Sequence, residues 1–225
     1  MRRETVFAIA FLVAAIGAAA DVWGYDWFGY YASFARDVQL DRQTFHLRDG
    51  DQRVPLSAIL EVDRATRAYV VCGCQQGDLL TVMRRFFDAD EISHLDDVRR
   101  LFGAVRLTAS VSGAIALLAA LGMTRRRIRG GLLVDAAGVV VLGAIAAVAF
   151  EPLFLAFHEL FFPQGNFLFD PTRENLTLVY PEEYWLGVTL RLGATVVAVC
   201  LLVGGLLTLP IRSNAAVRVN KEIVT

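Results

Sequence analysis

The sequence predicts an all-α membrane protein built as a bundle of four transmembrane helices. Its 225 residues are 56% hydrophobic and only 20% charged, and the mean hydropathy is +0.48, which is too apolar for an ordinary soluble domain of this length. Four apolar runs are each long enough to cross a bilayer: residues 5–23, 101–123, 131–157 and 184–209. Arginines flank these runs, where orientation in a membrane explains them, so nothing indicates a nucleic-acid partner.

The first apolar run allows two interpretations. Arg2 and Arg3, a short apolar core and three alanines before Asp21 fit a cleavable signal peptide. The same residues fit a retained first helix, because about 20 residues span a bilayer. We expect a retained helix. Both interpretations place the following segment outside the cytoplasm.

The largest polar region, residues 24–100, is predicted to form an extracytoplasmic cap of mixed α/β structure. Aromatic side chains crowd its start, as expected where a helix leaves the bilayer. Residues 38–47 partly alternate in polarity, and the turn sequence at 48–51 predicts a short hairpin that ends near Leu56. Residues 57–71 have the pattern of an amphipathic helix, which Gly73 and Gly77 interrupt. Residues 79–87 predict a second short helix or an interfacial segment.

Residues 90–101 are predicted to form a helix that continues into the second span. Acidic residues at its start suit a helix N-terminus. His94 and Asp97 are three residues apart, so they share one face of this helix and can hydrogen-bond or share a ligand. Arg106 follows about one turn inside the span. An ionisable side chain there is a functional hypothesis, although arginine can also snorkel to the surface.

The distribution of charge predicts the topology of a single membrane domain. Four arginines within residues 124–130 mark a cytoplasmic turn between the second and third spans. Glu151 lies near the outer boundary of the third span, and Arg191 about one turn from the outer end of the fourth. The basic tail, residues 210–225, returns to the cytoplasm. Both termini are therefore expected inside, and the polar loops and the active site outside.

The segment 157–185 is predicted to form an aromatic re-entrant or interfacial loop, of which residues 158–183 lie outside the span. Its polar residues are interspersed with phenylalanines, which favour the membrane interface. His158 is a candidate functional residue, because histidine transfers protons near neutral pH. The alternative is a well-packed interfacial loop in which this histidine is satisfied. His94 and His158 both lie at the outer boundary of a span, so the topology allows them to meet.

The remaining cysteines and histidines indicate less. Cys72 and Cys74 lie outside the cytoplasm, where they can form a small disulfide or a redox pair, and Cys200 is expected to be a small core residue of the fourth span. His46 is expected to be structural. We expect no metal, because no His-Glu-x-x-His or comparable spacing of zinc ligands occurs.

Two stretches of the sequence, residues 90–101 and 157–185, together resemble the lipoprotein intramolecular transacylase family of bacterial membrane proteins. The matching positions are Glu91, His94, Asp97, Val98, Phe157, His158, Phe161, Phe162, Asn166, Asp170, Pro171, Pro181 and Glu182. Phe167 stands where the family usually has tryptophan, and Tyr180 where it has phenylalanine. The resemblance covers residues 90–185 well, residues 24–80 match poorly, and the Cys-Gly-Cys sequence is not a feature of the family.

The resemblance implies an acyltransferase of the bacterial plasma membrane, with a diacylated lipoprotein in a lipid bilayer as its substrate. Such an enzyme moves the sn-2 acyl chain of the diacylglyceryl group to the α-amine of the same N-terminal cysteine, which gives a lyso-form lipoprotein. It requires no second substrate and no cofactor. We expect a monomer.

The resemblance and the chemistry together suggest roles for the candidate residues. His158 would be the acid or base nearest the ester, His94 its proton-transfer partner, and Asp97 the group that orients His94. An acyl-enzyme on His158 is an open alternative. Candidates for stabilising the oxyanion or binding substrate are Arg106, Arg191, Asn166, Tyr180 and Glu151. Asp170 and Pro171 are expected to shape the loop.

Two other classes of function remain open from the sequence. A non-catalytic membrane partner or sensor module would explain four helices and a cap without an active site. A membrane acyl hydrolase, with or without a metal, would differ only in using water instead of the amine as the acyl acceptor.

Overall fold

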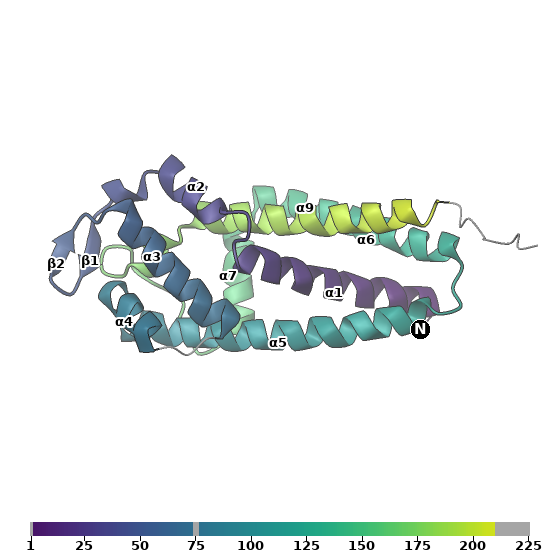
Figure 1. Ribbon diagram of the computed structural model, residues 1–225, viewed down its shortest axis with the longest axis horizontal. Helices are drawn as coiled ribbons and strands as arrows, with labels where there is room; N and C mark the ends of the chain where they lie inside the picture. Colours follow the sequence, from purple (N-terminus) through teal and green to yellow (C-terminus); the bar gives the residue numbers. More distant parts are fainter. Residues whose placement is uncertain (1, 74–76, 210–225) are drawn as a thin grey trace, which may run out of the picture.

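Four long helices form the membrane bundle of this computed structural model, which describes residues 2–73 and 77–209. They are α1 (Arg3–Gly24), α5 (Ala89–Ala120), α6 (Arg125–Val148) and α9 (Glu182–Leu206), and each is long and apolar enough to cross a membrane. Figure 1 shows them side by side, with α1 packed mainly on α5 and α6 mainly on α9. Large apolar side chains such as Leu117 and Val148 point outward, as expected for a surface that faces lipid. The predicted multi-pass helical membrane protein is thus confirmed.

Small residues and a compact apolar core hold the bundle together. A Cβ atom at Gly17 of α1 would overlap the Cβ of Ala109 on α5, so the glycine permits this close helix–helix approach. Phe7, Leu132 and Val196 are almost fully buried between the helices, and Cys200 is a free cysteine in the same core.

The cap at the left of Figure 1 is mainly helical. It comprises α2 (Tyr30–Asp37), a short 3-10 turn (Leu40–Arg42), strands β1 (Phe45–Leu47) and β2 (Gly50–Gln52), α3 (Leu56–Arg67), a π-helical turn (Ala68–Cys72) and α4 (Gly77–Phe86). The two strands pair antiparallel, with His46 opposite Asp51. The predicted hairpin and the two short helices are therefore present. The expectation of a Cys72–Cys74 pair falls partly on Cys74, which lies outside the described residues.

Helix α5 begins inside the cap and continues without a break into the bundle. Asp88 is its N-cap: one carboxylate oxygen accepts hydrogen bonds from the backbone N–H groups of Asp90 and Glu91, and Glu91 in return accepts one from Asp88 N–H. The helix predicted over residues 90–101, continuing into the second span, is therefore present and begins one residue earlier than expected. Its first turns project past the bundle, alongside α4 in Figure 1.

The region predicted as one third span, residues 131–157, is two helices. Helix α6 ends at Val148, Ala149 is not helical, and α7 (Phe150–Phe161) runs crosswise to the bundle in Figure 1. Pro152 explains the break, because its ring would clash with the carbonyl of Val148 inside a continuous helix, whereas the first turn of a new helix tolerates proline. The arginine-rich segment 124–130, predicted as a turn, is largely the first turns of α6.

Both described ends of the chain lie at the end of the bundle opposite the cap. Glu4 forms an ion pair with Arg127 at the start of α6, and Arg125 donates a hydrogen bond to the carbonyl of Leu209, just after α9. This arrangement agrees with four spans and two termini on one side. The cytoplasmic tail expected at 210–225 lies outside the described residues.

Candidate active site

His94 and His158 meet where the cap joins the bundle. His94 is in the second turn of α5 and His158 is in α7, and their ring centroids are 5.9 Å apart with the ring planes inclined by only 21°. The break after α6 turns α7 across the bundle, and this crossing is what brings His158 to α5. Phe162 lies against both rings, at centroid distances of 4.8 Å from His94 and 5.4 Å from His158.

His158 has its proton position set by one backbone hydrogen bond. Its Nδ1 lies 2.8 Å from the carbonyl oxygen of Phe154, one helical turn earlier. A carbonyl only accepts, so Nδ1 carries the hydrogen, and in the neutral ring Nε2 keeps its lone pair. Burial lowers the pKa of His158 below its ordinary value, which favours this neutral form. His158 therefore presents a proton acceptor at Nε2.

His94 is more deeply buried, with 6% of its surface exposed. It lies in the cap-side turns of α5, packed against Phe162 and Phe169. Its Nδ1 is buried without a hydrogen-bond partner among the described residues. Burial, and secondarily the proximity of His158, lowers the pKa of His94 to about 4. An unpaired polar nitrogen of this kind is available to a substrate or a water molecule.

Asp97 holds the aromatic loop against α5 through its side-chain oxygens. Its Oδ2 accepts hydrogen bonds from the side-chain amides of Gln164 at 2.7 Å and Asn166 at 2.9 Å, and its Oδ1 accepts one from Arg100 at 2.7 Å. Within the described part of the chain, no hydrogen bond joins Asp97 to His94. The side-chain N–H of Asn166 thus donates to Asp97, while the Oδ1 of Asn166 is buried without a hydrogen-bond partner among the described residues.

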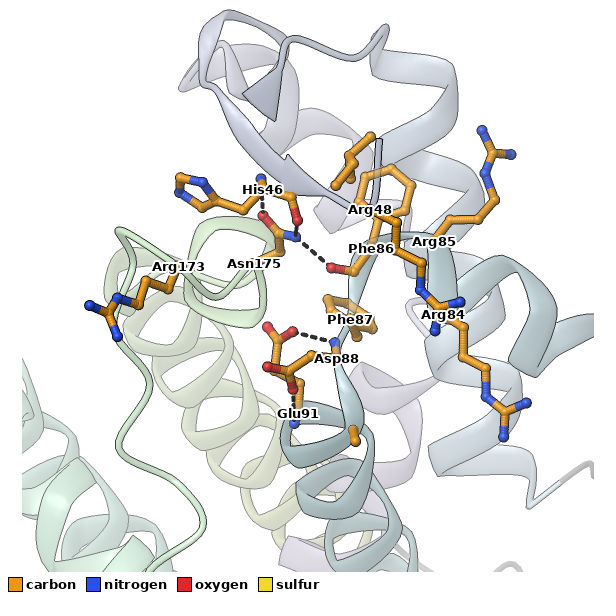
Figure 2. A pocket seen from close by; sticks show the side chains of 12 residues that line it. His46, Arg48, Arg84, Arg85, Phe86, Phe87, Asp88, Glu91, Arg173 and Asn175 are labelled. Carbon is orange, nitrogen blue, oxygen red and sulfur yellow. Dashed lines mark hydrogen bonds between the residues drawn. The ribbon is translucent and has the colours of Figure 1, made fainter. Parts of the chain in front are cut away.

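A second group of hydrogen bonds fixes the C-terminal part of the same loop, and Figure 2 shows those made by Asn175. The amide of Asn175 donates to the carbonyls of His46 and Phe86 and accepts from His46 N–H. Glu91, only 1% exposed, accepts from the N–H of Leu176 as well as from Asp88. The loop is thus tied to the hairpin, to α4 and to α5. Sequence reasoning missed this role of Glu91 and Asn175, although the Asp88-x-x-Glu91 spacing is a recognisable capping signal.

The two membrane arginines proposed as oxyanion donors are engaged elsewhere. Arg106 lies about 18 Å further along α5 than His94, at 1.5 Å per residue, and pairs with Asp21 of α1 at 2.9 Å. Arg191 donates to the carbonyl of Gly187 and lies over the ring of Tyr30, with 3.7 Å between the guanidinium carbon and the ring centroid. Neither has a described contact with the histidine pair.

Tyr180 also lies away from the histidines, in a buried polar network of the cap. Its hydroxyl donates to Asp63, which forms an ion pair with Arg67 at 2.8 Å. Arg67 also donates to the carbonyl of Gly24 at the C-terminus of α1 and to the hydroxyl of Tyr184. This network joins the cap to α1 and α9.

The remaining candidates, Glu151 and Asp170, form no hydrogen bond or ion pair with the two histidines in the described part of the chain. Glu151 is exposed in the first turn of α7, where an acidic side chain suits the helix dipole. Asp170 accepts hydrogen bonds from the N–H and hydroxyl of Thr172, which forms a turn around Pro171. The Nε2 of His46 lies 3.2 Å from the carbonyl of Pro171, so His46 also contributes to holding the loop.

Comparison with known proteins extends the sequence resemblance to the transacylase family over most of the chain. The profile of the family described as lipoprotein intramolecular transacylase Lit matches residues 5–185. The chain belongs to the Lit family. It is thus a membrane-integral member of a family of transferases that act on lipoproteins.

Solved structures of Lit from Bacillus cereus share the fold. The chain aligns with one of them at a TM-score of 0.74 and 15% identity, over 91% of this chain and 92% of that chain. Two variants of the same Bacillus cereus protein, with one histidine replaced by arginine or by alanine, align at a TM-score of 0.69 and 15% identity, over 91% of this chain and 88% or 90% of theirs. No curated protein matches the chain at a significant level.

Proposed function

We propose that this Lit-family protein moves the sn-2 acyl chain of a diacylglyceryl-modified lipoprotein to the α-amine of the N-terminal cysteine that carries the lipid, and so produces a lyso-form lipoprotein. The observation that carries the proposal is the pairing of the buried His94 with the half-buried His158, whose Nε2 has no hydrogen-bond partner among the described residues. Burial lowers the pKa of both rings, which favours their neutral forms.

The reaction needs one proton to move from nitrogen to oxygen. The amine nitrogen forms a bond to the ester carbonyl carbon, the bond from that carbon to the sn-2 oxygen breaks, and the proton lost by the amine ends on that oxygen. Nε2 of His158 accepts the proton and then returns it to the leaving oxygen, because histidine can act as base and acid in turn. His94, stacked beside it, serves as the partner in proton transfer. Neither step consumes an external reagent.

Asn166 fits the amine better than it fits an oxyanion. Its N–H donates to Asp97, and the polar atom left without a described partner is its carbonyl oxygen. That oxygen accepts hydrogen bonds, so it can hold the N–H of the attacking amine. Asp97 then acts as a positioning residue, because it fixes Asn166 and Gln164 beside His94.

The aromatic surroundings favour the amine over water as the acyl acceptor. Phe154, Phe157, Phe162 and Phe167 all lie with ring centroids within 5.4 Å of the ring of His158. Water excluded by such walls cannot compete with an amine that is tethered to the same molecule as the ester. The walls thus support transfer instead of hydrolysis.

The charge bias of the sequence supports an orientation with the cap and the histidines on the extracytoplasmic side of the bacterial plasma membrane. The arginines of residues 124–130 lie at the end opposite the cap, as the positive-inside rule expects for a cytoplasmic end. Diacylated lipoproteins would then approach laterally through the bilayer, and the enzyme would work as a monomer.

Mass spectrometry of N-terminal lipopeptides tests the proposal. A host that makes only diacylated lipoproteins would express the chain or its His158→Ala variant. The lipopeptide mass should be the same in both cultures. We expect one acyl chain to have moved to the cysteine amine only in the culture that expresses the wild-type chain. Loss of one acyl mass would identify a hydrolase. Unchanged lipopeptides with the well-expressed wild type would instead indicate a non-catalytic module.

A further inference from the structure

A second recess lies at the end of the bundle opposite the cap, between the start of α6 and the end of α9. Its volume is about 600 Å³, and its lining includes Arg125, Arg126, Arg129, Leu133, Leu207 and Thr208. It is separate from the histidine site, because α6 and α9 run the length of the bundle between them.

The charge of this recess is uncompensated. Three arginines line it, and no acidic residue of the described chain does. Arg125 donates to the Leu209 carbonyl, a neutral partner, while the guanidinium groups of Arg126 and Arg129 have no ion pair within the described residues. Arg127, in the same turn of α6, faces away and pairs with Glu4 at 3.1 Å. The positive charge is therefore directed into the recess.

The apolar part of the recess continues along the bundle. Arg126, Arg129 and Leu133 follow each other at helical spacings of three and four residues, so they lie on one face of α6. Leu133 is 47% exposed, and Leu207 of the α9 end faces the same space. A Cβ at Gly204 would lie 3.7 Å from Cγ of Arg129, an ordinary van der Waals distance, so the stem of this arginine lies against α9. Along α6 the lining changes from cationic at the start of the helix to apolar at Leu133.

We propose that this recess binds an anionic phospholipid, with the headgroup phosphate at Arg126 and Arg129 and an acyl chain along Leu133. The lining from α6 is cationic where the helix begins and apolar where it enters the hydrocarbon, which matches the order of groups in a phospholipid. Guanidinium groups bind phosphate through two parallel hydrogen bonds, so arginines suit this headgroup.

Thermal unfolding of the purified full-length protein in detergent tests the site. Dioleoyl phosphatidylglycerol is added in graded amounts, and dioleoyl phosphatidylcholine, with the same acyl chains but no net charge, serves as the lipid control. Inorganic phosphate forms the third arm. We expect phosphatidylglycerol to raise the unfolding temperature in a saturable manner, and the two other additions to have little effect.

Matched variants locate the effect. Arg126→Gln with Arg129→Gln should weaken the apparent affinity for phosphatidylglycerol about thirtyfold, on the basis of roughly 1 kcal/mol for each arginine near an anionic headgroup. Arg127→Gln, which removes one charge from the same part of α6 outside the recess, should leave the affinity unchanged relative to its own baseline.

Three results would overturn the proposal. An equal effect of phosphatidylcholine would mean that the groove takes any lipid, and an equal effect of inorganic phosphate would mean an anion site without a lipid. A loss of binding free energy in Arg127→Gln about half as large as in the double variant, which removes two charges, would mean that only net charge matters.

Discussion

The imidazole rings of His94 and His158 lie nearly parallel at 5.9 Å, although they come from helices that run in different directions. The pair exists because α7 departs from the axis of α6 at Ala149 and crosses toward α5. The crossing thus places two histidine rings side by side next to the aromatic loop, which is the arrangement that the proposed proton transfer uses.

Replacing either histidine of the pair should remove transacylation without unfolding the protein. His158→Ala and His94→Ala each lose a positioned acid–base group, which is worth a factor of about 10² to 10⁴ in rate. Conversion of a synthetic diacyl lipopeptide, followed by mass spectrometry, measures the loss. His46→Ala is the control, because that ring contacts only Asp51 and the Pro171 carbonyl in the described structure. Wild-type rates in both site variants would refute the assignment.

His94 and His158 should both titrate below pH 6.5, the ordinary pKa of histidine. Burial lowers the pKa of His94 to about 4 and also lowers that of His158, so both rings stay neutral, and able to accept a proton, as the pH falls from 7. The rate profile is not the test, because the α-amine of the substrate has an ordinary pKa of about 8 and must also lose its proton before it attacks. NMR titration of the histidine ring protons in detergent, with His94→Ala and His158→Ala to assign the signals, checks the prediction, and protonation of either ring above pH 7 would contradict it.

Asp97 and Asn166 should behave as one unit. Asp97→Ala frees the amides of Gln164 and Asn166, so Asn166 can no longer present its carbonyl oxygen to the amine. We expect each single variant to lower kcat and the double variant to lose little more than either one, which a double-mutant cycle measures. Additive losses would show that Asp97 does not act through Asn166. Glu159→Ala, exposed beside His158, is the control.

Arg106 should prove structural. Its guanidinium joins α5 to Asp21 of α1, far along the helix from His94. Arg106→Ala and Asp21→Ala are therefore expected to lower the unfolding temperature to a similar extent while the rate per folded molecule stays at the wild-type value. A selective loss of kcat in Arg106→Ala, absent from Asp21→Ala, would restore the arginine to the active site.

The Asp63–Arg67 pair should dominate the stability of the joint between cap and bundle. Its side chains are only 6% and 12% exposed, and Arg67 also satisfies the carbonyl of Gly24. Arg67→Met leaves a buried carboxylate without its charge partner, a change that costs about 3–5 kcal/mol. Arg127→Met breaks an exposed pair and should cost less than about 1 kcal/mol. Thermal unfolding in detergent compares them; equal effects would argue against a stabilising joint.

Some features of the site were readable from local sequence and were still overlooked. Pro152 predicts that a helix ends within the turn before it, and α6 indeed ends at Val148. The uninterrupted apolar run nevertheless favoured a single span over 131–157. Asp88 and Glu91 carry a capping pattern that fixes the first residue of the helix expected from residue 90. Both signals concern neighbours along the chain, so both belong to what a sequence can reveal.

Other features could not be read in this way. Arg106, Arg191 and Tyr180 were candidates for binding the oxyanion or the substrate, but position along the sequence leaves the direction of each side chain open. The structure turns Arg106 toward Asp21, Arg191 toward Tyr30 and Tyr180 toward Asp63. Asp97 was assigned to His94 because they share a helix face, yet its oxygens are taken by a loop distant in sequence.

By itself, the sequence determined the helical membrane class, the four apolar spans, the family and the expectation that His94 and His158 lie near each other. These follow from hydropathy, periodicity and short motifs, which are properties of neighbouring residues. Only the tertiary structure decided that His94 stacks on His158, that Asp97 holds Asn166 and that both membrane arginines serve other contacts. Such pairings depend on how each helix is rotated and crossed by packing against the others, and a one-dimensional pattern carries no record of that rotation.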